Sequence, residues 1–416
     1  MKLIRVFSQV ASIQIIATAL TLFLVLYYTR VLTIEEFGSY ALLMSVVSLA
    51  SLLAVAGINI SLVRTIPVSS KETSLRLIEL SRRRVFYRIF FITPFVVLFL
   101  FEKSDYLSIV FSCILIVLKC LTIRETSILN GMGKHKVSQI FLFLLFPLYN
   151  GVINFVLFLF DIKLTITLII AVMSLSSLLV QYQSRCYRKR NISSHEFEEE
   201  DSSKIVANSS IFWLSLVSVI DMIGVELGTL ILGFFGSPDD IALFRIASQT
   251  MILAVMVISS MNIILNPNIS KLYGKSCNNT SALQLYLTKS VRLTCFIIFP
   301  ILSILFIFGE YAIVTVFGQE YKYSHEIIKI LIFGQVFNSL CGSVGVVLNM
   351  TTNEKISVFI STLGLIIYIS LVIIGLALKF NVLYLVAIGS ALNVIFINVS
   401  SSYYINKKFG LITWLR

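Results

Sequence analysis

The chain has 416 residues, of which 57% are hydrophobic and only 13% are charged, and its mean hydropathy is +0.94. Ordinary soluble domains carry about 25% charged residues, so this composition argues against a soluble enzyme and for an integral membrane protein. The net charge of +12 does not indicate nucleic-acid binding, because the basic residues lie in gaps between apolar stretches and do not gather on one soluble face.

Apolar stretches of about 17–27 residues fill the chain, and a bilayer-spanning helix needs about 20 such residues. The first has a basic head and an apolar body too long for a signal peptide, so we expect it to be retained as a helix. The sequence therefore predicts an all-α integral membrane protein with about 12 transmembrane helices. In chain order the predicted spans are 8–29, 38–63, 85–101, 107–123, 138–160, 164–184, 206–233, 241–265, 291–308, 325–349, 356–378 and 383–404.

The gaps between the spans alternate in basic content. Most of the 33 Lys and Arg residues lie in the N-terminal segment, in the gaps after every second span and in the C-terminal segment. The intervening gaps are short and poor in them. Because cytoplasmic loops carry an excess of Lys and Arg, we expect both termini in the cytoplasm.

The two halves of the chain look like repeats. The segment Thr33-Ile-Glu-Glu-Phe-Gly-Ser-Tyr40 precedes the second span, and Ser237-Pro-Asp-Asp-Ile-Ala-Leu-Phe244 precedes the eighth. Leu129-Asn130 and Leu348-Asn349 likewise precede the fifth and the eleventh. The sequence predicts two pseudo-symmetric six-helix bundles, 1–184 and 206–416, joined by a cytoplasmic linker, 185–205, with a central cavity between them.

Charged residues inside the spans are candidate functional groups, because each is costly in lipid. Asp221 lies near the middle of span seven and Glu226 about one and a half turns further along, so they are about 140° apart on the helix. Either is a candidate for carrying a coupling proton or sodium ion. Arg245, in span eight, is a candidate contact for a substrate phosphate, and an acid of span seven is its alternative partner.

Other candidate substrate contacts lie in the first half. Arg30 and Arg64 follow the first two spans at opposite faces, where interfacial anchoring competes with binding of a diphosphate. Lys119 is about one turn from the end of span four, and snorkelling competes there. Gln14 begins a polar stripe with Thr18 and Thr21, and Asn154 follows Pro147; both sets are candidates for a cavity face or for interhelical hydrogen bonds.

No motif for nucleotide or metal chemistry is present in the sequence. It contains no GxxxxGK[ST], HExxH or GxSxG segment, and none of its six Cys residues shows CxxC spacing. We therefore expect no catalytic residue, no metal, no cofactor and no disulfide.

Three segments of the chain resemble those of a known family. Tyr28-Thr-Arg30-Val-Leu-Thr-Ile-Glu35-Glu-Phe-Gly38, followed by Leu62-Val-Arg64, is similar to the opening of polysaccharide-unit exporters, and Leu129-Asn-Gly-Met-Gly-Lys134 to the loop between their fourth and fifth spans. These are Wzx-type O-antigen flippases of the MATE-like multidrug/oligosaccharidyl-lipid/polysaccharide (MOP) flippase superfamily.

The resemblance implies a MATE-like fold and a function. An oligosaccharide repeat unit on polyprenyl (undecaprenyl) diphosphate would be flipped by alternating access across a bacterial inner membrane, with membrane lipids, a polysaccharide polymerase and a chain-length regulator as partners. The alternative is a cation-coupled multidrug or small-molecule antiporter of the same superfamily. A membrane enzyme such as an O-antigen polymerase is disfavoured, because the longest predicted outer segment, about 309–324, is short.

Overall fold

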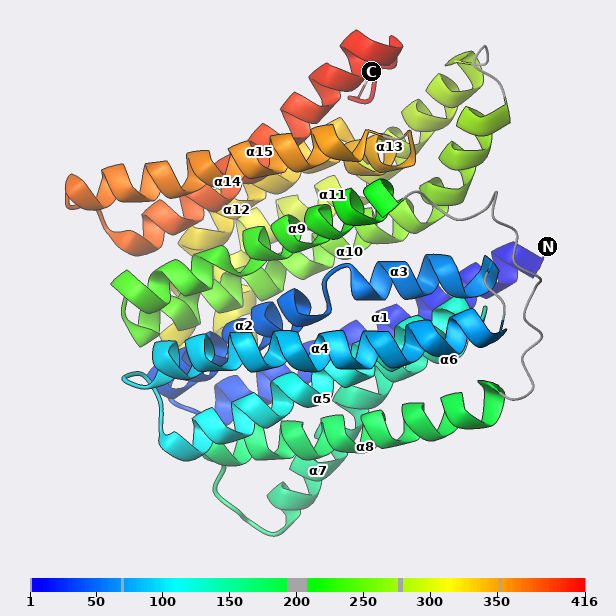
Figure 1. Ribbon diagram of the computed structural model, residues 1–416. Coiled ribbons are helices and arrows are strands. Elements are labelled where there is room, and N and C mark those ends of the chain that lie inside the picture. The colour runs from blue at the N-terminus through cyan, green and yellow to red at the C-terminus, as the bar shows by residue number, and fades with distance from the viewer. Residues whose placement is uncertain (1, 69–70, 193–207, 276–279, 352, 416) are drawn as a thin grey trace. The chain divides into compact units, whose positions relative to one another are not determined.

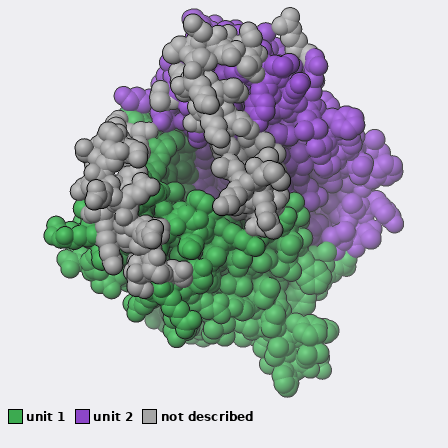
Figure 2. All heavy atoms as spheres, turned by 90° about the vertical axis from the view of Figure 1, so that its right-hand side faces the viewer, with its two compact units in different colours: residues 1–219 green, residues 220–416 purple. Residues whose placement is uncertain are grey.

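The computed structural model describes residues 2–68, 71–192, 208–275, 280–351 and 353–415, and over these residues its regular structure is helical, without strands (Figure 1). The prediction of an all-α membrane protein is confirmed. The chain divides into two compact units, residues 1–219 and 220–416, coloured separately in Figure 2. Residues 193–205 of the predicted linker and Cys277 lie outside the described residues.

Unit 1 contains the helices of the first half and the beginning of α9. Its most extensive helix packing is between α5 and α8, and α2 packs on α4 and α5. The elements are α1 (Lys2–Val31), α2 (Ile34–Val55), α3 (Ile58–Thr65), the 3-10 turn η1 (Ile66–Val68), α4 (Lys71–Leu100), α5 (Tyr106–Gly131), α6 (His135–Gln139), the π-helix η2 (Ile140–Leu144), α7 (Leu145–Leu159), α8 (Ile166–Ile192) and α9 (Asn208–Phe235).

Unit 2 contains the rest of α9 and the helices that follow. Here α12 and α14 pack most extensively on α15, and α11 packs on α12. The elements are α10 (Pro238–Lys275), α11 (Thr280–Val316), the 3-10 turn η4 (Gln319–Tyr321), α12 (Ser324–Cys341), α13 (Val344–Met350), α14 (Glu354–Ala377) and α15 (Val382–Phe409).

Ten of the described helices are long and apolar enough to cross a membrane, or eleven if the bent pair α12 and α13 forms one span. The predicted span 85–101 lies in α4, which is not among these ten helices. Even the last 18 residues of α4, its most apolar part, include three charged side chains, Arg83, Arg84 and Arg88. Large apolar side chains point outward along the helices, with Phe90 74% and Phe296 79% exposed, as helices facing lipid tails require.

Glycines interrupt two of the predicted spans. The predicted span 38–63 breaks at Gly57, whose φ of +77° is open to glycine, and an added Cβ would lie 2.9 Å from Ser215 Oγ. The predicted span 325–349 breaks at Gly342, with φ of +70°, and α12 and α13 meet there at 49°. Such breaks leave helix-terminal carbonyl and N–H groups that need other partners.

The repeated sequence segments form the same local structures in the two units. Thr33 and Glu36 make a capping box at the start of α2, in which each side chain bonds the backbone N–H of the other. Ser237 and Asp240 do the same at the start of α10. A capping box satisfies two helix-terminal donors at once, so the two helices begin in equivalent ways.

The second repeat ends a helix in each unit. Lys134 N donates to Leu129 O at 2.9 Å, and Asn353 N donates to Leu348 O at 3.0 Å. Both bonds reach back five residues and close the turn before the next helix. The internal repetition seen in the sequence is thus present in the backbone of each unit.

Two boundaries differ from the predicted ones. The division between the units falls at 219/220, inside α9, and not before this helix. Residues 185–192, assigned to the linker from their charge, continue α8 as helix. The reason is a buried ion pair: Arg188 on this turn bonds Glu125 of α5, so the helix is anchored beyond its apolar stretch.

Candidate functional site

A buried uncharged polar cluster joins α1 to α7 in unit 1. Tyr28 Oη donates to Asn150 Oδ1 at 3.2 Å, and Asn154 Nδ2 donates to Tyr28 Oη at 3.1 Å and to Asn150 Oδ1 at 2.8 Å. All three residues are buried. Asn150 Nδ2 and Asn154 Oδ1 have no hydrogen-bond partner among the described atoms, and such groups are costly when dry. The cluster therefore has spare capacity for one more polar group.

The polar stripe predicted on the first span behaves differently along its length. Gln14 Nε2 donates to Gln139 Oε1 at 3.2 Å and so contacts α6. Thr18 and Thr21 instead donate to carbonyl oxygens of their own helix, at Gln14 and Ala17, both at 2.9 Å. Threonine commonly makes this i−4 bond, so these two hydroxyls do not hold helices together here.

The three candidate cations of the first half do not converge. Arg30 is exposed at the end of α1, whereas Arg64 is half-buried in the last turn of α3. Lys119 Nζ lies 5.6 Å from the centre of the Phe146 ring, a cation–π distance. Lys119 also lines a small cavity of about 230 Å³ with Thr122. Their roles as substrate contacts stay predictions.

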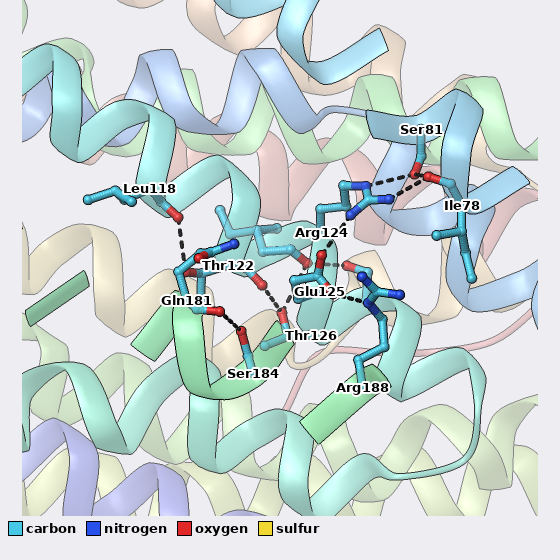
Figure 3. A network of polar contacts seen from close by, with 12 residues as sticks. Ile78, Ser81, Leu118, Thr122, Arg124, Glu125, Thr126, Gln181, Ser184 and Arg188 are labelled. Carbon is cyan, nitrogen blue, oxygen red and sulfur yellow. Dashed lines mark hydrogen bonds and ion pairs between the residues drawn. The ribbon is translucent and has the colours of Figure 1, made fainter. Parts of the chain in front are cut away.

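A buried ionic network that the sequence pattern did not reveal connects α4, α5 and α8 (Figure 3). Arg124 Nη1 lies 2.7 Å from Glu125 Oε1, and the other oxygen of Glu125 accepts from Arg188 Nε. Arg124 also donates to Ser81 Oγ at 2.8 Å and to the carbonyl oxygen of Ile78. The side chains of Arg124 and Glu125 are each only 3% exposed.

This network carries two positive charges and one negative charge. A buried ion pair is costly to desolvate, and removing one member typically costs about 3–5 kcal/mol, because a buried charge is left without its partner. Both guanidinium groups share the carboxylate of Glu125. Removing this carboxylate would therefore leave both arginines without their ion-pair partner. The sequence signal was an Arg-Glu pair at the end of an apolar span, but its partners come from helices distant in sequence.

In unit 2 the structure pairs two of the predicted site residues. Arg245 Nη1 of α10 lies 3.2 Å from Glu226 Oε2 of α9, and the glutamate side chain is 5% exposed. This is the acidic partner that the sequence left open for Arg245. Because each charge offsets the other, neither is presented singly to a substrate phosphate or an ion in this arrangement.

Asp221 has a different environment from Glu226. It is exposed into a cavity of about 320 Å³ that lies in unit 2 and is lined also by Gln335, Ser361 and Asn393. The Oδ1 atom of Asn393 is buried without a hydrogen-bond partner among the described atoms. One carboxylate with amide and hydroxyl oxygens is the donor set that hard cations prefer. The cavity can hold a proton on Asp221 or a small hard cation.

Groups of three or more His, Cys, Asp or Glu side chains suited to a metal do not occur among the described residues. The described cysteines, which are Cys113, Cys120, Cys186, Cys295 and Cys341, are free thiols.

Comparison with known proteins identifies the family of this chain. Residues 28–326, more than half of the chain, match a family model described as polysaccharide biosynthesis protein. The comparison with curated proteins finds no match.

Several solved structures share the fold over nearly the whole chain. A multidrug resistance MATE family transporter of the MOP superfamily, in an inward-facing conformation, is 13% identical with a TM-score of 0.73, covering 96% of this chain and 94% of that one. The MATE multidrug transporter DinF-BH, solved as a ligand complex, is 15% identical with a TM-score of 0.70, covering 99% and 97%. A MOP superfamily transporter from Pyrococcus furiosus is 13% identical with a TM-score of 0.69, covering 97% and 95%.

The two kinds of comparison agree with the resemblance found in the sequence. These structures confirm the expectation of a MATE-like fold. Because their sequence identity to this chain is low, the similarity concerns the fold and not the substrate. The chain belongs to the polysaccharide biosynthesis protein family and has the fold of the MATE transporters of the MOP superfamily.

Proposed function

We propose that this protein is a flippase that moves a polyprenyl-diphosphate-linked oligosaccharide repeat unit, of O-antigen or a related surface polysaccharide, from the cytoplasmic to the periplasmic leaflet. The observation that carries the proposal is the match of residues 28–326 to a polysaccharide biosynthesis family on a chain with a transporter fold. The location would be a bacterial inner membrane, with both termini in the cytoplasm.

Physical chemistry supports a protein catalyst for this movement. Sugar hydroxyls and a diphosphate cannot enter hydrocarbon unaided, because unpaired polar and charged groups cost several kcal/mol each there. A polar passage through a helical bundle replaces their hydration, while the polyprenyl chain remains in lipid. Alternating exposure of that passage to the two sides moves the head group without covalent chemistry.

The cations and acids described above have proposed roles in this process. Arg30, Arg64 and Lys119 are proposed contacts for the diphosphate, and Gln14 and Asn154 for sugar hydroxyls. Arg245 is a proposed diphosphate contact in a state in which its ion pair with Glu226 is open. Asp221 is the proposed coupling residue, because it opens into a cavity with oxygen donors. Glu226 is the weaker candidate, since its carboxylate is paired with Arg245. A polysaccharide polymerase and a chain-length regulator would act on the product.

The experiment that tests the proposal measures the sidedness of lipid-linked sugar. The gene is deleted and restored in cells that make the repeat unit, and an impermeant reagent labels the units accessible from the periplasm. Accumulation of unlabelled units on deletion, with labelling regained on restoration, is the expected result. Unchanged labelling on deletion would reject the flippase.

The second candidate function is a cation-coupled antiporter for small molecules. It is favoured by the Asp221 cavity and by the fold shared with two multidrug transporters. The same deletion strain separates the two functions, because an antiporter predicts greater sensitivity to cationic drugs with normal surface polysaccharide.

A further inference from the structure

A second cavity, of about 500 Å³, lies in unit 1 beside the break between α2 and α3. Its wall includes Gly57 and Ser61 at the break, Arg84 and Arg88 of α4, and residues of the part of α9 that belongs to unit 1. The described residues that line it include no Asp or Glu. Its volume falls within the range of small-molecule sites, roughly 300–1,000 Å³.

The two arginines are neighbours on one face of α4. They are four residues apart, so Arg88 lies about 6 Å further along the helix than Arg84. Arg88 Nη1 donates to the carbonyl oxygen of Ala56, the last residue before the break, at 2.5 Å. Arg84 makes no ion pair with a described acidic residue. Like charges at this spacing repel each other, so an anion between them would relieve the repulsion.

Two further features add positive potential to the same wall. Ser81 lines the cavity and accepts a hydrogen bond from Arg124, so the buried network with its excess positive charge lies directly behind it. Ile58, the first residue of α3, also lines the cavity. The N-terminal end of a helix carries a partial positive charge that favours anions.

We propose that this cavity binds the diphosphate of the lipid-linked substrate, with Arg84 and Arg88 donating charge-assisted hydrogen bonds to its oxygens. The identity of the lipid rests on the proposed function, whereas the group recognised is a diphosphate. Arg84 lies near the middle of α4 and directly precedes the predicted span 85–101, so it marks the basic boundary of the apolar part of this helix. The orientation predicted from the basic gaps places this boundary at the cytoplasmic leaflet, among the lipid phosphates, so the cavity would serve substrate capture.

The test measures binding by the full-length protein in nanodiscs of zwitterionic lipid, with undecaprenyl diphosphate as the probe. Arg84→Gln is the first variant, because Arg84 makes no described contact that the fold requires. Loss of a hydrogen bond between charged groups predicts about tenfold weaker binding or more. Arg88→Lys, which retains a donor for the Ala56 carbonyl, should bind more weakly than the wild type because one donor replaces the bidentate guanidinium.

The matched control removes two charges from other faces of the same helix. Arg82 and Arg83 are exposed, bond Glu79 and line a separate apolar groove of α4. The double variant Arg82→Gln/Arg83→Gln should bind undecaprenyl diphosphate with near wild-type affinity. An equal loss in Arg84→Gln and in this control would overturn the proposal, because the effect would then be one of general charge.

Competition distinguishes the source of the phosphate. Displacement of the probe by inorganic pyrophosphate supports a diphosphate site. Displacement by phosphatidylglycerol at equal concentration would overturn the proposal in favour of an ordinary anionic-lipid site. If deletion of the gene leaves sidedness unchanged but Arg84→Gln still weakens binding, the flippase fails and the site stands. If the flippase is established and Arg84→Gln binds normally, the site alone fails.

Discussion

At the scale of single residues, the charges of this protein differ chiefly in whether a partner satisfies them. Glu125 lies between two guanidinium groups and is buried, whereas Asp221 opens into a cavity with neutral oxygen donors. The first arrangement suits a fixed structural group. The second suits a group whose charge changes, because neutral neighbours tolerate either protonation state.

Glu125 is therefore expected to be essential for stability. Replacing Glu125 by Ala leaves Arg124 and Arg188 buried without their carboxylate, which should destabilise the protein by about 3–5 kcal/mol. The measurement is the melting temperature in detergent, followed by fluorescence-detected gel filtration. The control is Glu79→Ala, which removes an exposed partner of Arg82 and should cost about 1 kcal/mol or less. Equal melting temperatures for the two variants would show that the network is not structural.

Asp221→Asn tests the coupling role with little change of shape. A coupling charge gains about 2.3 kcal/mol per 100 mV of membrane potential, which corresponds to about fiftyfold in an accumulation ratio. The variant should therefore transport far more slowly at normal protein abundance, and its residual transport should no longer respond to dissipation of the ion gradient. If Asp221→Asn transports at the wild-type rate and its transport still depends on the ion gradient, Asp221 has no coupling role.

At the scale of secondary-structure elements, helix breaks determine where polar groups become available. The break at Gly57 separates α2 from α3 and places the Ala56 carbonyl within reach of Arg88. The sequence contains no proline there, so an uninterrupted span was the natural prediction. The left-handed conformation of Gly57 depends on tertiary packing, which the pattern of apolar residues does not reveal.

Gly57→Ala should be more harmful than the same change at Gly133. Both glycines have positive φ, +77° and +73°, so each substitution carries a backbone cost of about 1–2 kcal/mol. At Gly57 the new Cβ would also lie 2.9 Å from Ser215 Oγ, whereas nothing lies within 4 Å at Gly133. The difference between the two melting temperatures measures the steric part. Indistinguishable variants would mean that the packing at the break relaxes freely.

At the scale of the whole molecule, the sequence predicts the elements better than their contacts. Hydropathy located the spans, and the segments at Thr33 and Ser237 form equivalent capping boxes. The network of Arg124, Glu125 and Arg188 was missed, because hydropathy and loop charge do not say which helices meet. Arg84 and Arg88 were not among the predicted site residues for the same reason.

The orientation of the whole chain is open to a direct test. Lys136 and Lys163 are exposed residues at opposite ends of the predicted span 138–160, and the basic gaps predict Lys136 inside and Lys163 outside. In a variant without the native cysteines, an impermeant maleimide should label Lys163→Cys in intact cells and Lys136→Cys only after permeabilisation. The reverse pattern would invert the topology. It would then place Arg84 and Arg88 at the periplasmic leaflet, where they would serve the release of a diphosphate lipid rather than its capture.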